Sequence, residues 1–414
     1  MVALPADRPA ATRRPARGRT ARLLRHHPVT VVVTGPYVLL VVAPALVFDN
    51  PDTGFVLKLV LVAGVTVAAT ETLVRLATHR RGRRVVRAAP QGPADPRVFA
   101  VARVVAVVSI VADVVAAFAG RGTIAAQLAA EVTPSPVAGV AALFFGWKYL
   151  AVALLLYAVL RGQAQAGSFY RWAAGLIAAQ LAVAALTAIT APVAAYLVVV
   201  AAAGTVAGVV RGTHVVAALA VLLLLWPGLF ALRNDIRLAG GVPVDTTVTA
   251  HDRLRLDLQM ARLEPYTVPA DVGQPDLVQV VAYGLVPRVL APDRSTISTG
   301  ARINQYLGGS ATSSYSFLSI GNVYFLDGLG GVIVFFGLWT ALAVLLTSRV
   351  RGAPGPVRLS LFCFVVAGPL CWSSTYPDMM IAVLQYTVAA LPVFFVLRAT
   401  RAVAGQARHR AAPA

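Results

Sequence analysis

Repeated apolar runs of about 20 residues are the feature that most restricts how this chain can fold. A run of that length crosses the ~30 Å hydrocarbon core of a bilayer as an α-helix. The runs are continuously apolar and do not alternate with polar residues, which disfavours a membrane β-barrel. Only 13% of the 414 residues are charged, where a soluble domain carries about 25%. The sequence therefore predicts an all-α polytopic membrane protein.

About ten spans are expected, seven within residues 29–232 and three within residues 328–397. The run that follows the basic N-terminal tail 1–28 is too long for the apolar part of a signal peptide, so we interpret it as a retained span. We expect residues 1–28 to be cytoplasmic and disordered, and residues 398–414 to form a basic cytoplasmic tail. The predicted spans are 29–48, 55–77, 98–119, 137–160, 172–189, 192–210, 213–232, 328–347, 359–373 and 378–397.

The basic residues indicate which side of the membrane each connection faces. The net charge is +19, and the arginines gather in short segments beside the apolar runs, as between residues 78 and 97. Cytoplasmic connections of membrane proteins carry such an excess of positive charge. We therefore expect a multi-pass protein of the cytoplasmic membrane with both termini in the cytoplasm, and no nucleic-acid partner.

The long connection 233–327 has a different charge balance. It holds nine of the 17 acidic residues and eight arginines, so it is nearly neutral in a strongly basic chain. This balance is typical of the outer side of a membrane. We interpret 233–327 as one large extracytoplasmic loop. Its stretch 283–331 is polar and rich in Gly, Ser and Thr, which favours a functional role beside the membrane.

A few ionisable residues fall inside the apolar runs, where insertion costs at least ~2.5 kcal/mol each. Lys58 and Arg103 lie close enough to span ends to reach the interface. Asp113 and Lys148 lie on adjacent spans at comparable distances from the outer loop, and we expect them to pair. Whether that pair is structural or lines a cavity is left open by the sequence.

Residues 251–264 predict an amphipathic helix in the loop, although alternating leucines leave a strand open. Three apolar residues fall on one helical face: Leu254, Leu258 and Ala261. One interpretation is a helix lying on the membrane surface with solvated charges. The other is that Arg253 and Arg255 face an anionic lipid diphosphate.

The polar stretch contains short motifs in a suggestive order. They are Pro287-Arg288, Ala291-Pro292-Asp293-Arg294, the Ser/Thr-rich stretch 312–316, Gly321-Asn322-Val323-Tyr324 and Asp327-Gly328-Leu329-Gly330-Gly331. In order and spacing, the region 211–339 resembles the O-antigen polymerases, the Wzy-type polymerases of oligosaccharide repeat units. The sequence departs from that pattern at three places: Ala291 stands for Trp, Arg294 for Lys and Asn322 for an acid. Because 34 of the 36 basic residues are Arg, the change at Arg294 keeps the charge.

The resemblance implies a GT-C-like membrane glycosyltransferase that joins lipid-linked repeat units on the outer face of the membrane. Its donor and acceptor would be undecaprenyl-diphosphate-linked oligosaccharides, and its further partners membrane lipid and a chain-length regulator. A diphosphate leaving group gains negative charge in the transition state, and planar Arg side chains bind phosphate oxygens in pairs. Arg288 and Arg294 are therefore the predicted catalytic residues, with Asp293 as a candidate base and His251 as another.

The predicted substrate-binding residues are Arg302, Arg253, Arg255, Arg211, Asn322 and Tyr324. Arg211 has two interpretations, because its position after an inner span also suits a positively charged anchor at the cytoplasmic interface. No Asp-x-Asp pattern and no paired histidines occur in the loop, so we expect a metal-independent reaction without a cofactor.

Other functions stay open from the sequence. An O-antigen ligase-like enzyme, or another polyprenyl-phosphate-dependent glycosyltransferase, would have the same leaving group and differ in its acceptor. A polysaccharide flippase or transporter would carry charges along several spans and two related halves, which we do not find in the sequence. A non-catalytic assembly protein would tolerate the loss of the loop arginines.

Overall fold

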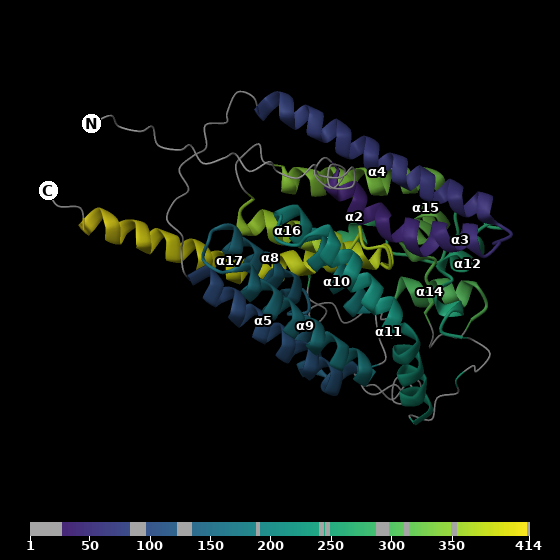
Figure 1. The fold of residues 1–414 in the computed structure, drawn as a ribbon, viewed down its shortest axis with the longest axis horizontal. Coiled ribbons are helices and arrows are strands. Elements are labelled where there is room, and N and C mark those ends of the chain that lie inside the picture. The colour runs from purple at the N-terminus through teal and green to yellow at the C-terminus, as the bar shows by residue number, and fades with distance from the viewer. Residues whose placement is uncertain are drawn as a thin grey trace, which may run out of the picture.

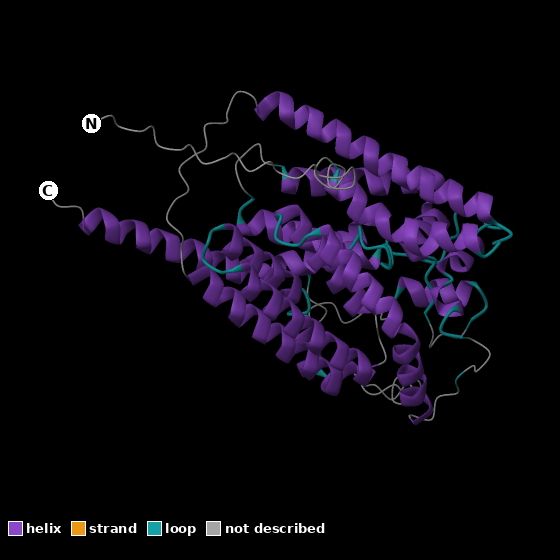
Figure 2. Cartoon of the chain, viewed as in Figure 1, coloured by secondary structure: helices purple, strands orange, loops and turns teal. Residues whose placement is uncertain are grey.

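The protein is a bundle of long helices with a folded loop region at one end. A computed structural model describes residues 27–82, 97–121, 135–187, 191–239, 244, 249–286, 298–309, 314–348 and 354–411. Every regular element in these ranges is helical (Figure 2). The predicted all-α class is confirmed for the described part of the chain. The predicted tail 1–28 lies almost entirely outside it.

The helices of the bundle run side by side along the long axis of the molecule (Figure 1). They are α2 (Pro28–Tyr37), η1 (Val38–Val42), α3 (Ala43–Val47), α4 (Thr53–Gly82), α5 (Arg97–Ala116), η2 (Ala117–Arg121), α7 (Pro136–Ala142), α8 (Trp147–Leu160), α9 (Ala166–Thr187), α10 (Ala191–Ala207), α11 (Gly212–Ala239), α15 (Leu318–Thr347), α16 (Pro356–Ala367) and α17 (Asp378–Ala411). Four short helices follow α11: η3 (Asp252–Leu254), α12 (Leu256–Ala261), α13 (Leu277–Leu285) and α14 (Thr299–Tyr306).

Seven stretches of the described chain are long and apolar enough to cross a membrane. They are Pro28–Val47, Thr53–Thr78, Arg97–Ala119, Pro136–Leu160, Gly212–Ile236, Leu318–Thr347 and Asp378–Arg398. Two shorter apolar helices, Pro192–Ala207 and Pro356–Ala367, run with them. The protein is therefore an all-α polytopic membrane protein, as the apolar runs predict.

Hydrogen bonds between chain-distant residues define the two ends of the bundle. At one end, Asn50 donates to Asp257 (2.9 Å) and Thr299 donates to Asp378 (2.9 Å), which joins the short helices to the bundle. We call this the loop end; α12 and α14 lie there, on the right in Figure 1. At the other end, Arg358 donates to the carbonyl of Leu345 (2.7 Å). We call this the basic end, and α17 extends beyond it, toward the left in Figure 1.

Several predicted spans differ from the observed helices. The run 137–160 is not continuous, because a turn separates α7 from α8 at the point where Gly146 meets the ring of Tyr386. A Cβ at Gly146 would lie 2.4 Å from that ring, so only glycine fits beside Tyr386 at this turn. The helix predicted over 328–347 begins earlier, at Leu318, and is kinked at Gly328 (φ 68°). The predicted tail 398–414 is largely helical, since α17 continues to Ala411.

Helix α8 lies at the centre of the bundle. Its residues from Lys148 to Ala158 are all buried, and α5, α9, α10 and α16 pack around it. A helix that is apolar on every side is stable only when surrounded by other apolar surfaces. This packing explains why α8 lacks a polar face.

The predicted pair of Asp113 and Lys148 is confirmed. The Lys148 ammonium lies 3.2 Å from an Asp113 carboxylate oxygen and donates to the Gln180 side chain at 2.9 Å. The Gln180 amide also donates to Asp113. All three side chains are at most 4% exposed, so the pair is enclosed between α5, α8 and α9.

Glu71 is a second buried charge inside a span, and it has a capping role. Its carboxylate accepts hydrogen bonds from the backbone N–H groups of Val29 (3.3 Å) and Thr30 (2.7 Å), at the start of α2. Arg75, one turn later on α4, lies 2.7 Å from the same carboxylate. The first N–H groups of a helix have no partner within it, and a carboxylate there is stabilising.

Candidate functional site

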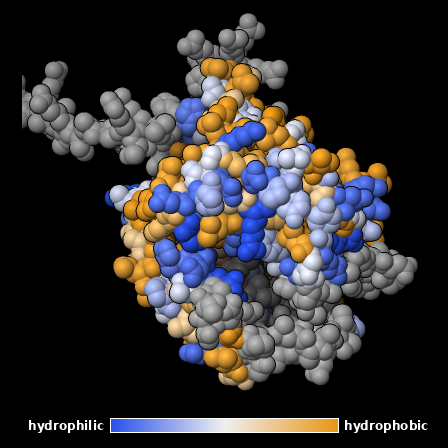
Figure 3. Space-filling view, turned by 90° about the vertical axis from the view of Figure 1, so that its right-hand side faces the viewer, coloured by the Kyte–Doolittle hydropathy of each residue, from blue (hydrophilic) through white to orange (hydrophobic). Residues whose placement is uncertain are grey.

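The loop end contains most of the predicted site residues that the structure describes. Viewed from that end, the surface is rich in hydrophilic residues and is hollowed near its centre (Figure 3). The stretch 287–297, which holds Arg288, Asp293 and Arg294, lies outside the described residues. The described part of the site consists of the helices that flank this stretch and the surface around them.

Both flanks of the stretch 287–297 are attached to α17. On one side, the Gln385 side chain donates to the carbonyl of Tyr283 in α13 at 3.1 Å, and Gly284 packs against Leu384. On the other side, the Asp378 carboxylate accepts from the backbone N–H and the hydroxyl of Thr299, each at 2.9 Å. A carboxylate at a helix N-terminus satisfies donors that the helix leaves unpaired. The described residues on both sides of the predicted catalytic stretch therefore lie next to the start of α17.

Helix α12 is part of the core of the loop end. Its residues Leu256, Met260 and Ala261 are buried, and it contacts α3, α4 and α15. The predicted apolar face of this helix is therefore wrong, since Leu258 is 41% exposed, and its position at the membrane surface stays a prediction. The reason is that a short 3-10 turn precedes α12, so the helix begins at Leu256 and the buried positions are shifted.

Arg255 forms an ion pair next to this helix. Its guanidinium donates to both carboxylate oxygens of Asp257, at 2.9 and 2.8 Å, and lies 5.0 Å from the ring centre of Phe48. Asn50 donates to the same carboxylate at 2.9 Å. Burial raises the pKa of Asp257, but these hydrogen bonds outweigh it and hold that pKa below its usual value. Arg255 therefore contacts the protein's own carboxylate, whereas Arg253 is exposed.

Asn322 is fully buried and holds the turn that starts α15. Its side-chain oxygen accepts from the backbone N–H of Phe317 (2.9 Å), and its amide donates to the Ser316 hydroxyl (2.9 Å) and the Ser374 carbonyl (3.0 Å). An amide can donate and accept at once, whereas an ionised carboxylate only accepts. An Asn can therefore make these three hydrogen bonds, whereas an ionised carboxylate could make only the first. The side chain predicted to bind substrate contacts protein here instead.

An acidic residue to which the sequence reasoning gave no role lies at the kink of α15. Asp327 directly precedes Gly328, and its exposed carboxylate is hydrogen-bonded to Tyr376. Burial, together with the nearby Asp327 charge, raises the pKa of Tyr376 to about 12, so this hydroxyl is a donor at neutral pH. The sequence feature that could have pointed to Asp327 is an Asp-Gly pair at the boundary between the loop and a span.

Aromatic rings and arginines gather around Phe317 and Phe325 at the loop end, some of them exposed and some partly buried. We call the set Arg262, Tyr266, Arg302, Tyr306 and Tyr315 the aromatic–arginine surface. The Tyr266 and Tyr306 rings lie 6.4 Å apart and both pack on Phe325, while Arg262 lies 5.8 Å from the Tyr315 ring centre. Arg302 stands one helical turn before Tyr306 on α14, so the two side chains share a face. Its guanidinium is so near Gly273 that a Cβ there would lie 3.1 Å from it.

Two other predicted residues lie apart from this surface. Tyr324 is half-buried, with its ring 5.6 Å from that of Phe55. Arg211 is exposed. Two residues before it, the Val209 carbonyl accepts a hydrogen bond from the Tyr170 hydroxyl near the start of α9 (2.9 Å). The turn before α9 lies at the basic end, so Arg211 is not brought together with the other arginines. The anchor interpretation of Arg211 agrees with this position.

Comparison with known proteins gives no further assignment. No family model matches the sequence, and no curated protein or solved structure matches it. The resemblance to O-antigen polymerases therefore depends on the motif stretches alone. Within the described ranges, no group of three or more His, Cys, Asp or Glu side chains is placed to share a metal ion, and metal independence stays a prediction.

Proposed function

We propose that this protein is a membrane glycosyltransferase that polymerises undecaprenyl-diphosphate-linked oligosaccharide repeat units. The observation that carries the proposal is the aromatic–arginine surface at the loop end of a polytopic bundle. Aromatic rings present flat apolar faces to the C–H faces of sugars, and arginines bind phosphate oxygens. A lipid-linked oligosaccharide combines both chemistries at a membrane surface.

The proposal includes ten crossings and a GT-C-like arrangement. The seven long apolar stretches, with α9, α10 and α16, make ten (7 + 3). With both termini in the cytoplasm, the loop end faces outward in the cytoplasmic membrane. The arginine-rich connections then all face the cytoplasm, as the charge distribution of membrane proteins requires.

The reaction we propose is a single glycosyl transfer. A hydroxyl of the acceptor oligosaccharide attacks the anomeric carbon of the donor, the new C–O bond forms, and the bond to the lipid diphosphate breaks. Arg288 and Arg294 stabilise the charge that develops on the departing diphosphate, and such stabilisation is commonly the largest catalytic contribution. A carboxylate removes the hydroxyl proton; Asp293 is the predicted base, and Asp327 is a second candidate at the same end.

The buried ion pair favours an enzyme over a transporter. A flippase or transporter needs polar groups along a cavity between its helices. Asp113 and Lys148 are instead enclosed and satisfied by each other and by Gln180.

Gel analysis of surface polysaccharide from the source organism tests the proposal. We expect Arg288→Ala and Arg294→Ala to abolish polymer with accumulation of single repeat units, and Arg294→Lys to keep part of it. Arg171→Ala is the matched control, since Arg171 is an exposed arginine at the basic end. Unchanged chain lengths in both loop variants would refute a catalytic role. With purified protein, loss of polymerisation on adding EDTA and recovery with Mg²⁺ would refute metal independence.

A further inference from the structure

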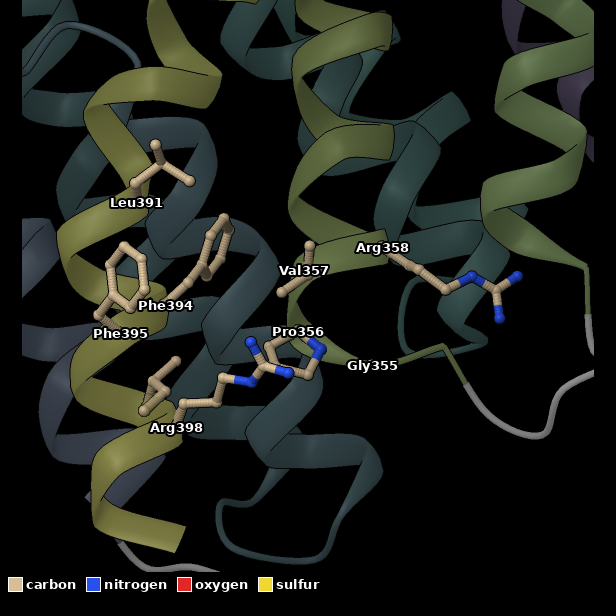
Figure 4. Close-up of a pocket in the computed structure, with 9 residues that line it drawn as sticks. Gly355, Pro356, Val357, Arg358, Leu391, Phe394, Phe395 and Arg398 are labelled. Atoms are coloured by element: carbon tan, nitrogen blue, oxygen red, sulfur yellow. The ribbon is translucent and has the colours of Figure 1, made fainter. Parts of the chain in front are cut away.

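A pocket at the basic end lies between the start of α16 and the second half of α17. Its volume is about 440 Å³, and its apolar lining includes Val357, Leu391, Phe394 and Phe395. Figure 4 shows these side chains around a gap that separates the two helices. Phe395 is 65% exposed and Leu391 is 43% exposed, so the pocket opens sideways toward the surroundings of the bundle.

Two arginines border this pocket, but only one is directed into it. Arg398 reaches across the gap toward Pro356, whereas Arg358 points away from it (Figure 4). The guanidinium of Arg358 donates to the carbonyls of Leu345 and Ser348, each at 2.7 Å, and so closes the C-terminal end of α15. Among the described residues, Arg398 has no carboxylate within ion-pair distance.

The start of α16 adds positive potential to the same place. Its N-cap residue is Gly355, which provides no side-chain acceptor, and because Pro356 has no N–H the first available N–H of the helix is that of Val357. Unpaired N–H groups and the helix dipole make such an end attractive to anions. The guanidinium of Arg398 and this helix end face one another across the pocket mouth.

The depth of the pocket matches the boundary between lipid headgroups and acyl chains. In the sequence the apolar run of α17 ends at Leu397 and is followed by Arg398 and Arg401, and Pro356 is the first residue of the apolar helix Pro356–Ala367. The charged mouth therefore lies at the end of the spans. The apolar lining lies one to two turns deeper, within the hydrocarbon layer.

We propose that this pocket binds one anionic phospholipid, with its phosphate between Arg398 and the start of α16 and an acyl chain along Leu391 and Phe395. A zwitterionic lipid would fit the apolar part but would gain less from the positive mouth. Basic residues beside an anionic membrane surface each contribute about 1 kcal/mol. The preference for an anionic headgroup is thus set mainly by Arg398.

Native mass spectrometry of the full chain in a mild detergent tests this assignment. The protein is titrated with phosphatidylglycerol or with phosphatidylcholine, and the fraction that retains one lipid is measured. We expect wild-type protein to retain phosphatidylglycerol preferentially, and Arg398→Gln to weaken that retention about fivefold, which corresponds to about 1 kcal/mol. Arg398→Lys should stay within about twofold of wild type because it keeps the charge, and Leu391→Trp should reduce retention of both lipids by filling the pocket.

Arg171→Gln is the matched control, because it removes one exposed positive charge from the basic end outside the pocket. It should leave lipid retention unchanged, and melting temperatures of all variants should match that of wild type. Equal weakening by Arg171→Gln and Arg398→Gln would overturn the proposal, since the preference would then be a general charge effect. Equal retention of the two lipids by wild type would also overturn it. A dimer of the protein that Leu391→Trp abolishes would overturn it as well, because a second copy of the chain would then occupy the pocket.

Discussion

Two buried carboxylates, Asp113 and Asp257, each meet a cation and a neutral amide, but they do so at different depths. Asp113 pairs with Lys148 at 3.2 Å inside the bundle, where both side chains are at most 4% exposed. Asp257 pairs with Arg255 at 2.8 Å in the loop, where Arg255 is 14% exposed. Gln180 and Asn50 are the respective amide partners.

The two clusters connect different parts of the fold. The Asp113 cluster joins three helices of the bundle, and none of its charges can reach water without moving a helix. In the Asp257 cluster the cation is a near neighbour in sequence, and the cluster connects the loop to the turn between α3 and α4 through the Asn50 amide and the ring of Phe48. The same chemistry therefore fixes the fold in one place and the position of a loop in the other.

The largest expected effect is that of Lys148→Met. Removal of one partner from a buried ion pair leaves an uncompensated charge and costs about 3–5 kcal/mol. We expect a large loss of thermal stability in detergent, measured by fluorescence-detected size exclusion after heating. The double variant Asp113→Asn, Lys148→Met should recover part of the loss.

Lys58→Met is the matched control, because Lys58 is exposed and is the other lysine of the chain. It should melt like wild type. A Lys148→Met variant as stable as this control would mean that the buried pair does not hold the three helices together.

Asp257→Ala should have a smaller, local effect. It leaves the Asn50 amide without its partner and Arg255 without its ion pair, for which about 1–3 kcal/mol is expected. Hydrogen exchange measured by mass spectrometry should show faster exchange in α12 and unchanged protection in α8. The exposed Glu264, just after α12, provides the control, Glu264→Ala; equal effects of the two variants on α12 would contradict the role assigned to Asp257.

The loop cluster should also respond to pH. Because the pKa of Asp257 is lower in the folded protein than in the unfolded chain, its contribution is complete above the unfolded value of about 4 and is lost as pH falls through the folded value. Exchange protection of α12 in wild type should therefore approach that of Asp257→Asn as the pH is lowered below about 4. Wild-type protection of α12 that does not move toward that of Asp257→Asn as the pH falls below the unfolded value would contradict this assignment.

The smallest effect on stability is expected for Arg253→Gln. Arg253 is exposed, and surface changes of this kind stay within about 0.5 kcal/mol. If Arg253 binds substrate, polymer chain length should change while the melting temperature stays constant. A lower melting temperature without a change in polymer would mean that Arg253 has only a structural role.

Much of the fold could be predicted because a membrane imposes a simple length and composition rule on each helix. The Asp113–Lys148 pair was predictable for the same reason, since charges in apolar runs require partners. Gln180 was missed because a neutral amide in an apolar run gives little signal. The apolar face of α12 was mispredicted because a short 3-10 turn shifted the helix start. The turn between α7 and α8 was missed, and there Gly146 packs against Tyr386, which is 240 positions away in the chain.

The sequence by itself determined the class of protein, the approximate spans and the polar stretch at one boundary, because these follow from local hydropathy and charge. Only the tertiary structure decided which polar groups meet. In the folded chain, Asn322 stabilises the turn before α15 and Arg255 pairs with Asp257. Arg211 lies at the basic end, and Arg398 lies opposite the start of α16 across a pocket. Hydrogen bonds and ion pairs depend on distances of a few ångströms between chain-distant residues, and only packing sets those distances.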